Sequence, residues 1–147
     1  MHQIREVDTR DPAVARKIHC FNRREPKIFP ELHFHHLRGG VWWLAFKKSG
    51  EAVGFAGMVP HLPGTGVPIG FLKRAYVTPE ARGCWLQRRF IRVRCDRAQV
   101  LGWTHLLAES TADNVHSGNN LLACGFDMFE PDQPWGPHGS VYWIKKL

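Results

Sequence analysis

The sequence predicts an α/β (α+β) fold in which helices alternate with the strands of one mixed sheet. The order of apolar, strand-like runs and amphipathic segments is the first indication, since helices between strands are typical of sheets with crossover connections. The length is the second: 147 residues make a single domain, 1–147, with room for one substantial core. The third is a composition of 44% hydrophobic and 22% charged residues, typical of a globular protein in water.

The N-terminal part is predicted to contain one strand followed by two helices. Residues 3–8 form the strand, with one apolar side chain near each end of the run. A helix then runs from Asp11-Pro12 to about Phe21, because aspartate caps a helix and proline suits its first turn. After a basic stretch broken by proline, a short helix is expected within 29–37.

Two strands rich in apolar residues are predicted to form a hairpin. They cover 41–46 and 52–59, on either side of the turn at 48–51. Gly54 and Gly57 lie inside the second strand, where glycine indicates a bulge or the close approach of another group.

The adjacent Trp42 and Trp43 must face opposite sides of their strand. One is expected in the core. The other is expected beneath the N-terminal helices or lining a pocket.

The rest of the chain continues the alternation after a surface loop at 61–68. The predicted strands are 69–77, 105–110, 126–130 and 140–145, and the predicted helices are 83–101 and the segment from Asp113 or Asn114 to Cys124-Gly125. The first of these helices has the clearest pattern, since Leu86, Phe90, Val93, Arg97 or Ala98, and Leu101 recur at helical spacing.

The segment from Val77 to Gln87 is the most informative piece of the chain. An apolar strand ends at Thr78-Pro79, a short loop containing Gly83 follows, and an arginine-rich helix begins. The first N–H groups of a helix have no partner within the helix, and the helix dipole favours a negative charge there. The order of strand, glycine loop and helix therefore predicts a ligand that carries phosphate.

The chain is basic, with a net charge of +7 at pH 7. Six arginines lie close together in the sequence: Arg82, Arg88, Arg89, Arg92, Arg94 and Arg97. Such a cluster is either a solvated helix face or a site for an anionic partner, which includes nucleic acid as well as a small phosphorylated cofactor. On a helix Arg88 and Arg92 share a face that Arg94 does not, and this broken stripe favours the cofactor over nucleic acid.

The four cysteines are expected to be free thiols in a reducing compartment. Cys20, Cys84, Cys95 and Cys124 form no Cys-x-x-Cys pair, so the spacing of zinc and redox sites is missing. The N-terminus has no apolar signal core, and no apolar run approaches the ~20 residues that span a membrane. These features predict a cytoplasmic protein without membrane contact.

Three motifs in the C-terminal two thirds resemble those of the GNAT family of N-acyltransferases. The strand ending in Tyr76-Val77-Thr78-Pro79-Glu80 resembles the central strand of the family. Arg82-Gly83-x-x-Leu86 is similar to its pyrophosphate loop for acetyl-coenzyme A. Asn114-x-x-Ser117, followed by Leu121 and Gly125-Phe126, resembles a later helix that usually carries a tyrosine. The run from Trp135 to Lys145 is similar to GNAT-like proteins encoded in phages and prophages.

The resemblance implies a specific architecture. It has a sheet of about six to seven strands, helices on both faces, and a splay between the two central strands. Residues 1–50 would shape the acceptor side and residues 52–147 the cofactor-binding core. The residues expected to bind acetyl-coenzyme A are Val77, Arg82, Gly83, Cys84, Trp85, Leu86, Gln87, Arg88, Asn114 and Ser117.

The chain departs from the family pattern at three positions. Trp85 and Gln87 stand where the loop usually has glycine or another small residue, and Leu121 stands where a tyrosine usually protonates the leaving thiolate. The loop keeps its role if the Trp85 ring points away and its N–H faces the ligand; otherwise pyrophosphate binding is weakened.

Acyl transfer to an amine requires a base, and a proton for the departing thiolate. Glu109 is the first candidate for the base, and the alternative is a carboxylate paired with an arginine. Tyr76 and Tyr142 are candidates for the proton donor, and the alternative for each is packing in a strand. The histidines at 33, 35 and 36 have no zinc-site spacing, so we expect no metal.

The sequence thus predicts an enzyme that transfers an acetyl group from acetyl-coenzyme A to an amine of a small molecule or protein. The alternatives are a nucleic-acid-binding or nucleobase-modifying protein and a non-catalytic acyl-coenzyme A-binding module. Tryptophans exposed near the C-terminus would suit a homodimer contact.

Overall fold

The computed structural model describes residues 1–26 and 29–147. The strands are β1 (Gln3–Val7), β2 (Val41–Phe46), β3 (Ala52–Pro60), β4 (Ile69–Val77), β5 (His105–Thr111), β6 (Asp127–Phe129) and β7 (Ser140–Lys146). The α-helices are α1 (Pro12–Asn22), α2 (Phe34–Gly39), α3 (Leu86–Val100) and α4 (Val115–Ala123), and a 3₁₀ turn spans Pro79–Ala81. The element order is as predicted, with helix starts and strand ends that differ by a few residues.

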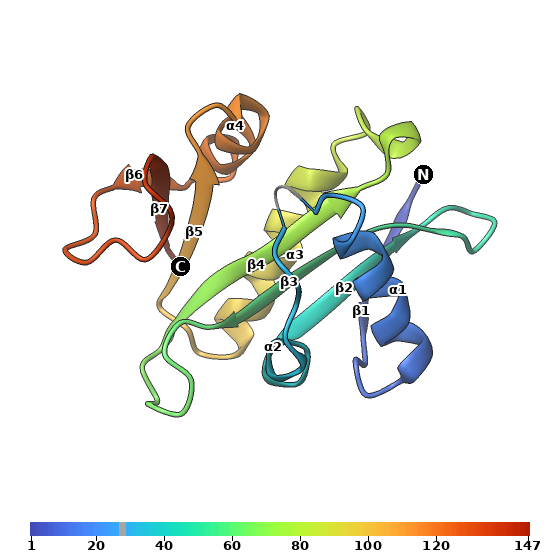
Figure 1. Ribbon diagram of the computed structural model, residues 1–147, viewed down its shortest axis with the longest axis horizontal. Helices are drawn as coiled ribbons and strands as arrows, with labels where there is room; N and C mark the ends of the chain where they lie inside the picture. The colour runs from blue at the N-terminus through green and yellow to red at the C-terminus, as the bar shows by residue number, and fades with distance from the viewer. Residues whose placement is uncertain (27–28) are drawn as a thin grey trace.

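The seven strands form one mixed sheet in the order β1-β2-β3-β4-β5-β7-β6. All neighbours are antiparallel except β4 and β5, which run parallel and are joined by the crossover through α3. Figure 1 shows α1 and α2 in front of the sheet and α3 behind it, so helices cover both faces. The α/β prediction with a mixed sheet of six to seven strands is confirmed.

The two faces of the sheet have separate hydrophobic cores. Trp42 packs with Ile18 and Phe21 of α1 on one face, which we call the α1/α2 face. Trp43 packs with Phe90 of α3 on the other, the α3/α4 face. Both indoles are buried, so the prediction of one tryptophan in the core and one beneath the N-terminal helices is confirmed.

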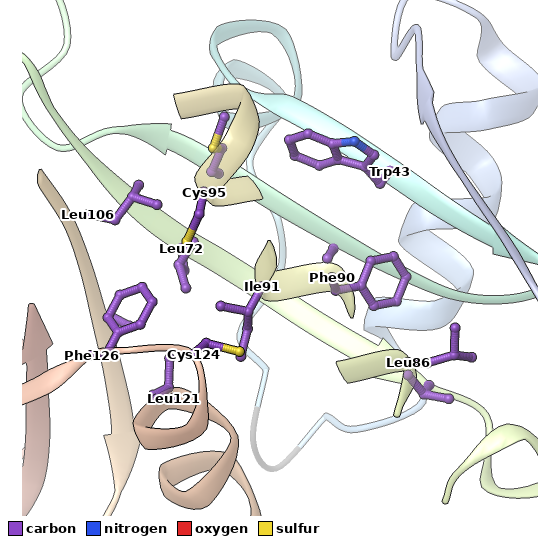
Figure 2. Packing of buried hydrophobic residues seen from close by; sticks show 14 of the residues in the cluster. Trp43, Leu72, Leu86, Phe90, Ile91, Cys95, Leu106, Leu121, Cys124 and Phe126 are labelled. Carbon is purple, nitrogen blue, oxygen red and sulfur yellow. The ribbon is translucent and has the colours of Figure 1, made fainter. Parts of the chain in front are cut away.

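The larger core lies on the α3/α4 face. Figure 2 shows side chains of α3 and α4 pointing toward Leu72 of β4 and Leu106 of β5. The buried positions of α3 are Leu86, Phe90, Ile91, Arg94, Cys95 and Ala98. The sequence pattern placed Val93 and Leu101 on this stripe. Val93 does pack against this core, half-buried, but Leu101 is exposed and Arg94 is fully enclosed instead. The reason is geometric: Arg94 follows Phe90 by one turn, so it shares the inward face regardless of its charge.

A β-bulge interrupts the pairing of β3 with β4. Ala56 pairs with Ala75 and Gly57 with Lys73, which leaves Arg74 as the extra residue, with a φ of 63° in the left-handed region. A Cβ on Gly57 would collide with the Trp42 ring. Both features predicted at the β3 glycines, a bulge and the close approach of another group, are therefore confirmed.

The bulge changes which side chains share a face. Lys73 and Tyr76 are three residues apart and would lie on opposite faces of a regular strand. With one residue inserted between them, Tyr76 lies in the α1/α2 core and Leu72 and Val77 both lie in the α3/α4 core. Among the described residues, no helix has the length and apolar character needed to cross a membrane.

Candidate functional site

The central strands β4 and β5 separate partway along their length. Their pairing runs from Ile69 with His105 to Phe71 with Leu107 and stops there, although β4 continues to Val77 and β5 to Thr111. Figure 1 shows the two strands diverging toward the end that carries α4. The splay expected between the two central strands is confirmed. It exposes strand edges with unpaired backbone groups, which are ready partners for an extended ligand.

The N–H of Val77 points into this opening. Thr78 donates its N–H to the carbonyl of Val53 at 2.8 Å, so these two residues form a hydrogen-bonded pair of the β3–β4 ladder. The next pair, Val77 with Gly54, is then a pair without mutual hydrogen bonds, whose N–H and C=O groups point away from the partner strand. The Val77 carbonyl accepts instead from Nε of Arg82 at 2.9 Å, which leaves the N–H available to a ligand.

The loop after β4 contains two residues in the left-handed region of backbone conformation. Gly83 has a φ of 82° and Trp85 a φ of 63°, so two left-handed residues alternate immediately before α3. Alternating conformations of this kind turn successive N–H groups toward one point, and the N-terminus of α3 adds its own unpaired donors. A non-glycine residue in the left-handed region costs roughly 1–2 kcal/mol, so Trp85 holds this conformation against its intrinsic preference.

The ring of Trp85 faces solvent. It is 63% exposed, and the guanidinium of Arg88 lies over it at 4.4 Å from the ring centroid. The sequence left two alternatives for Trp85. The structure has the first of them, in which the ring points outward and the backbone of the loop keeps its conformation. The stacked Arg88 lies beside the start of α3 and donates from Nε to Asn120 of α4 at 3.0 Å.

The other side chains of the loop differ in their contacts and in their exposure to solvent. Arg82 crosses the loop to Val77, and its Nη2 lies 3.8 Å from Glu25. Cys84 is exposed, whereas Leu86 is buried in the α3/α4 core. Leu86 therefore presents its backbone N–H, and not its side chain, at the start of α3.

Arg94 ties α3 to the bulge beneath the opening. Its Nη1 donates to the carbonyl oxygens of Gly57 at 3.0 Å and Arg74 at 3.2 Å, and its Nε donates to Phe90 at 3.0 Å. The side chain is 2% exposed and has no carboxylate partner among the described residues. Burial lowers the pKa of Arg94 to about 10, well above neutrality, so the buried guanidinium is charged.

The N-terminus of α4 lies at the open end of β5. Asn114 caps the helix, because its Oδ1 accepts from the N–H of Ser117 at 3.1 Å, and its amide NH₂ remains free to donate. Leu121, about two turns further on, is 4% exposed and packs with Cys124 and Phe126 in the α3/α4 core. The position that carries tyrosine in the resembling family is therefore part of the core here.

Glu109 lies on β5 beyond the last β4–β5 pair, on the α1/α2 face of the sheet. Its Oε2 accepts from Oγ of Ser140 at 2.8 Å, and a Cβ on Gly136 would collide with the carboxylate. The partner of this carboxylate is thus a serine hydroxyl. The alternative, an ion pair with an arginine, is not found among the described residues.

The two tyrosines predicted as proton donors have different surroundings. Tyr142 lies directly opposite Glu109 in the β5–β7 ladder, and its hydroxyl oxygen accepts from the N–H of Gly136 at 2.8 Å. Among the described residues, none accepts a hydrogen bond from the Tyr142 hydroxyl, so its hydrogen is free to donate. Tyr76 is buried in the α1/α2 core against Phe21, with ring centroids 5.8 Å apart.

Two cations of β4 lie on the same face as Glu109. Lys73 and Glu109 each stand two residues beyond the last pair, Phe71 with Leu107, and so face one another across the start of the opening. Burial lowers the pKa of Lys73, as does the neighbouring Arg74, while Glu109 acts in the opposite direction. Arg74 is held by Asn22, which accepts from its Nε at 3.2 Å, and by the carbonyl of Pro30 at 3.2 Å.

Three histidines of α2 and its cap gather near these cations. The rings of His35 and His36 are 4.2 Å apart, and His33 lies 5.5–5.7 Å from both. Burial, followed by the charge of Lys73, lowers the pKa of His36 to about 4. Within residues 1–26 and 29–147, no three His, Cys, Asp or Glu side chains are arranged to hold a metal ion.

Sequence reasoning did not identify Arg94, Lys73, Ser140 or Gly136 as parts of this region. The burial of Arg94 follows from its helical register, which a sequence can reveal. The juxtaposition of Glu109 with Ser140 and Gly136 depends on how β7 and the loop before it fold back onto β5, and no local pattern encodes that pairing.

The fold thus combines an opening between β4 and β5 with a loop of two left-handed residues before α3. No protein-family model matches the sequence, and no curated protein sequence does so. Solved structures do match over nearly the whole chain. A putative acyl-CoA N-acyltransferase from Klebsiella pneumoniae has a TM-score of 0.74 at 20% identity, covering 100% of this chain and 98% of its own.

Two further matches have the same architecture. A GNAT-family acetyltransferase from Staphylococcus aureus has a TM-score of 0.78 at 14% identity and covers 100% of this chain and 99% of its own. A phosphinothricin acetyltransferase of the GNAT superfamily from Sinorhizobium meliloti, solved with AcCoA, has a TM-score of 0.76 at 16% identity, covering 99% and 88%. The chain therefore has the fold of the GNAT acetyltransferases.

Proposed function

We propose that the chain is an acetyl-coenzyme A-dependent N-acetyltransferase that acts on an amine of a small-molecule or protein acceptor. The observation that carries the proposal is the opening between β4 and β5, with the Val77 N–H directed into it beside the left-handed turn at Gly83 and Trp85. A thioester carbonyl in the opening would accept from this N–H while the pyrophosphate lies on the turn.

The donor set of the chain complements the negative charge of coenzyme A. The N–H groups of residues 83–87, together with Arg82 and Arg88, would surround the pyrophosphate with positive partial and full charges. The free amide of Asn114, beside Ser117 at the open end of β5, would meet the amide groups of the pantetheine arm. In this assignment residues 52–147 form the cofactor-binding core, and residues 1–50 shape the acceptor side.

The chemistry requires the acceptor nitrogen to attack the thioester carbon directly. The new carbon–nitrogen bond forms as the carbon–sulfur bond breaks, and an acceptor ammonium loses two protons in all. Glu109 passes one of them to solvent, and the other protonates the leaving thiolate. Tyr142 is better placed than Tyr76 to deliver that proton, since its hydroxyl hydrogen is free and it lies opposite Glu109.

Calorimetric titration with acetyl-coenzyme A tests the proposal, with coenzyme A as the control. We expect binding of both at micromolar concentrations, followed by release of thiol when an amine panel is added. An absence of binding below millimolar concentrations would contradict the assignment of the site.

A non-catalytic acyl-coenzyme A-binding module is the second candidate. Burial of Leu121 favours it, because the tyrosine hydroxyl that the resembling family uses is replaced by a core side chain. Binding without any acetyl transfer or thioester hydrolysis would select this candidate over the enzyme.

The arginines of α3 lend less support to a nucleic-acid function. Arg88 contacts Asn120, Arg89 donates to the His2 carbonyl at 2.9 Å, and Arg97 pairs with Glu6 at 2.9 Å. With Arg94 buried as well, these side chains form no continuous basic stripe. A steep loss of nucleic-acid affinity with added salt would revive this alternative.

A further inference from the structure

The face of the sheet opposite α3 carries one cation and one anion that confront each other at the start of the β4–β5 opening. Lys73 and Glu109 both project to the α1/α2 face, two residues past the last paired positions of their strands. They do not form one of the ion pairs of the described residues. Two opposite charges that are not paired with each other match a ligand that carries both complementary charges.

The other cation of β4 is already engaged. Arg74 donates to Asn22 and to Pro30, and its guanidinium lies 5.5 Å from the centroid of the Phe29 ring. Within the described part of the chain, the ammonium of Lys73 makes no hydrogen bond. Of the two β4 cations, Lys73 is therefore the one that a ligand can reach without breaking a contact of the described residues.

An aromatic floor closes the paired side of the opening. Trp135, in the loop between β6 and β7, contacts Tyr142 of β7 with centroids 4.5 Å apart and Phe71 of β4 at 6.0 Å. The indole thus reaches from β7 across β5 to β4 on the same face as Glu109. His61 adds an edge contact to Trp135 at 5.5 Å. A ligand between Lys73 and Glu109 would lie against this apolar floor.

We propose that the acetyl acceptor is a free amino acid with an apolar side chain, whose carboxylate binds Lys73 and whose ammonium binds Glu109. This inference rests on the proposed acetyltransferase function and adds the substrate class to it. The apolar side chain packs on Trp135 and Phe71, and the ammonium is brought to the carboxylate that removes its proton. The partial burial of Lys73, which lowers its pKa, strengthens its interaction with a carboxylate that replaces water.

A matched set of acceptors tests the inference. L-leucine, L-leucinamide and 3-methylbutylamine share one side chain and differ only in the group that would meet Lys73. We expect kcat/KM for leucine to exceed that for either analogue by about ten- to a hundredfold, the effect typical of one charge-assisted hydrogen bond. L-leucinamide is the stricter control, since its amine is less basic than that of leucine and a larger fraction of it is in the reactive neutral form.

Substitution of Lys73 separates binding from folding. With leucine, Lys73→Met should raise KM by about ten- to a hundredfold with kcat nearly unchanged, while kcat/KM for 3-methylbutylamine stays within about threefold. Lys73→Arg should restore most of the leucine activity, and the exposed Lys48→Met should behave as wild type. A merely structural role for Lys73 would lower the rates for all acceptors together.

The outcomes distinguish this inference from the function on which it rests. If acetyl-coenzyme A does not bind, the proposed function fails. If it binds and all three amines react equally, or a leucyl peptide reacts better than leucine, only the amino-acid assignment is overturned. If it binds and leucine neither reacts nor raises the melting temperature of the coenzyme A complex, the assignment is likewise overturned.

Discussion

Arg94 donates from Nη1 to the carbonyl of Gly57 at 3.0 Å, and the same nitrogen reaches the carbonyl of Arg74 across the bulge. A β-bulge leaves backbone groups that the ladder no longer pairs. In this protein a side chain from α3 supplies the missing donor at the strand that opens toward the site. The bulge and the helix behind it therefore form one structural unit.

Replacing Arg94 should destabilise the fold strongly. Arg94→Met would leave the carbonyls of Gly57 and Arg74 buried without donors, at a cost of about 2–4 kcal/mol in the free energy of unfolding. Urea unfolding measures this change. Arg92→Met is the matched control, because Arg92 is exposed on the same helix and its loss should cost less than about 0.5 kcal/mol. Equal effects of the two substitutions would contradict the role of Arg94.

Gly83→Glu should abolish acetyl-coenzyme A binding. The new carboxylate would lie beside the helix N-terminus where the pyrophosphate is expected, and like charges repel there. The φ of 82° also strains any side chain, so a control must carry the same strain. Gly50→Glu does so, since Gly50 has a φ of 90° in the β2–β3 turn and, like Gly83, has open space around its Cβ position. Calorimetry should detect normal affinity in the control, and unchanged affinity in Gly83→Glu would refute the loop assignment.

Glu109→Gln should lower kcat/KM by about 10²–10⁴-fold, the range for loss of a general base. Glutamine preserves the acceptor oxygen for Ser140, so the fold and the affinity for acetyl-coenzyme A should stay unchanged. Ser140→Ala is the comparison, because it removes only the hydroxyl that orients the carboxylate and should cost far less. Steady-state kinetics measures this loss. Wild-type rates in the Glu109→Gln variant would exclude Glu109 as the base.

Tyr142→Phe should lower kcat more than Tyr76→Phe. The Tyr142 hydroxyl accepts from Gly136 and keeps its hydrogen for a departing thiolate, whereas Tyr76 is packed among the aromatic rings of the α1/α2 core. The comparison of kcat at saturating acetyl-coenzyme A decides between them. A larger loss in Tyr76→Phe, at equal thermal stability, would move the proton donor to β4.

The free energy of unfolding should fall in mild acid because of His36. Its pKa is about 4 in the folded protein and near 6.5 when unfolded, so the unfolded chain binds the extra proton first. This contribution is fully present above pH 6.5 and is lost as the pH falls toward 4. Because the imidazole is partly hydrated, we expect about 1–2 kcal/mol rather than the full linkage value.

Urea unfolding at pH 7 and pH 4.5 measures this loss. His36→Gln should remove that part of the pH dependence, whereas His138→Gln, at an exposed loop position, should retain it. An identical pH dependence in wild type and His36→Gln would show that His36 titrates normally.

The elements that could be predicted are those with a local cause. The helix from Asp11-Pro12 has a capping carboxylate that accepts from Ala13 at 2.9 Å, and the proline suits its first turn. The opposite faces of Trp42 and Trp43 follow from strand periodicity alone. The loop after β4 could be recognised because its glycine and the following helix are contiguous in sequence.

The features that could not be predicted depend on pairings between segments that are distant in the sequence. The helix expected within 29–37 begins at Phe34 and ends at Gly39, and Lys27 and Ile28 lie outside the described residues. The left-handed Arg74 has no sequence signal, since the bulge arises from the register of β3 against β4. In the same way, Glu109 could be proposed from its strand, but its contacts with Ser140 and Gly136 come from β7 and its preceding loop.

The two independent cores on either side of the sheet have a consequence for how this protein can change. Side chains on the α1/α2 face can be exchanged in sets, with compensating changes among Ile18, Phe21 and Phe55, while Trp43 and Phe90 hold the opposite layer together. Under the proposed acetyltransferase function, mutations in one layer would change the contacts to the acceptor while the opposite layer keeps its shape. Acceptor specificity and cofactor use would then be separately evolvable properties of a single sheet.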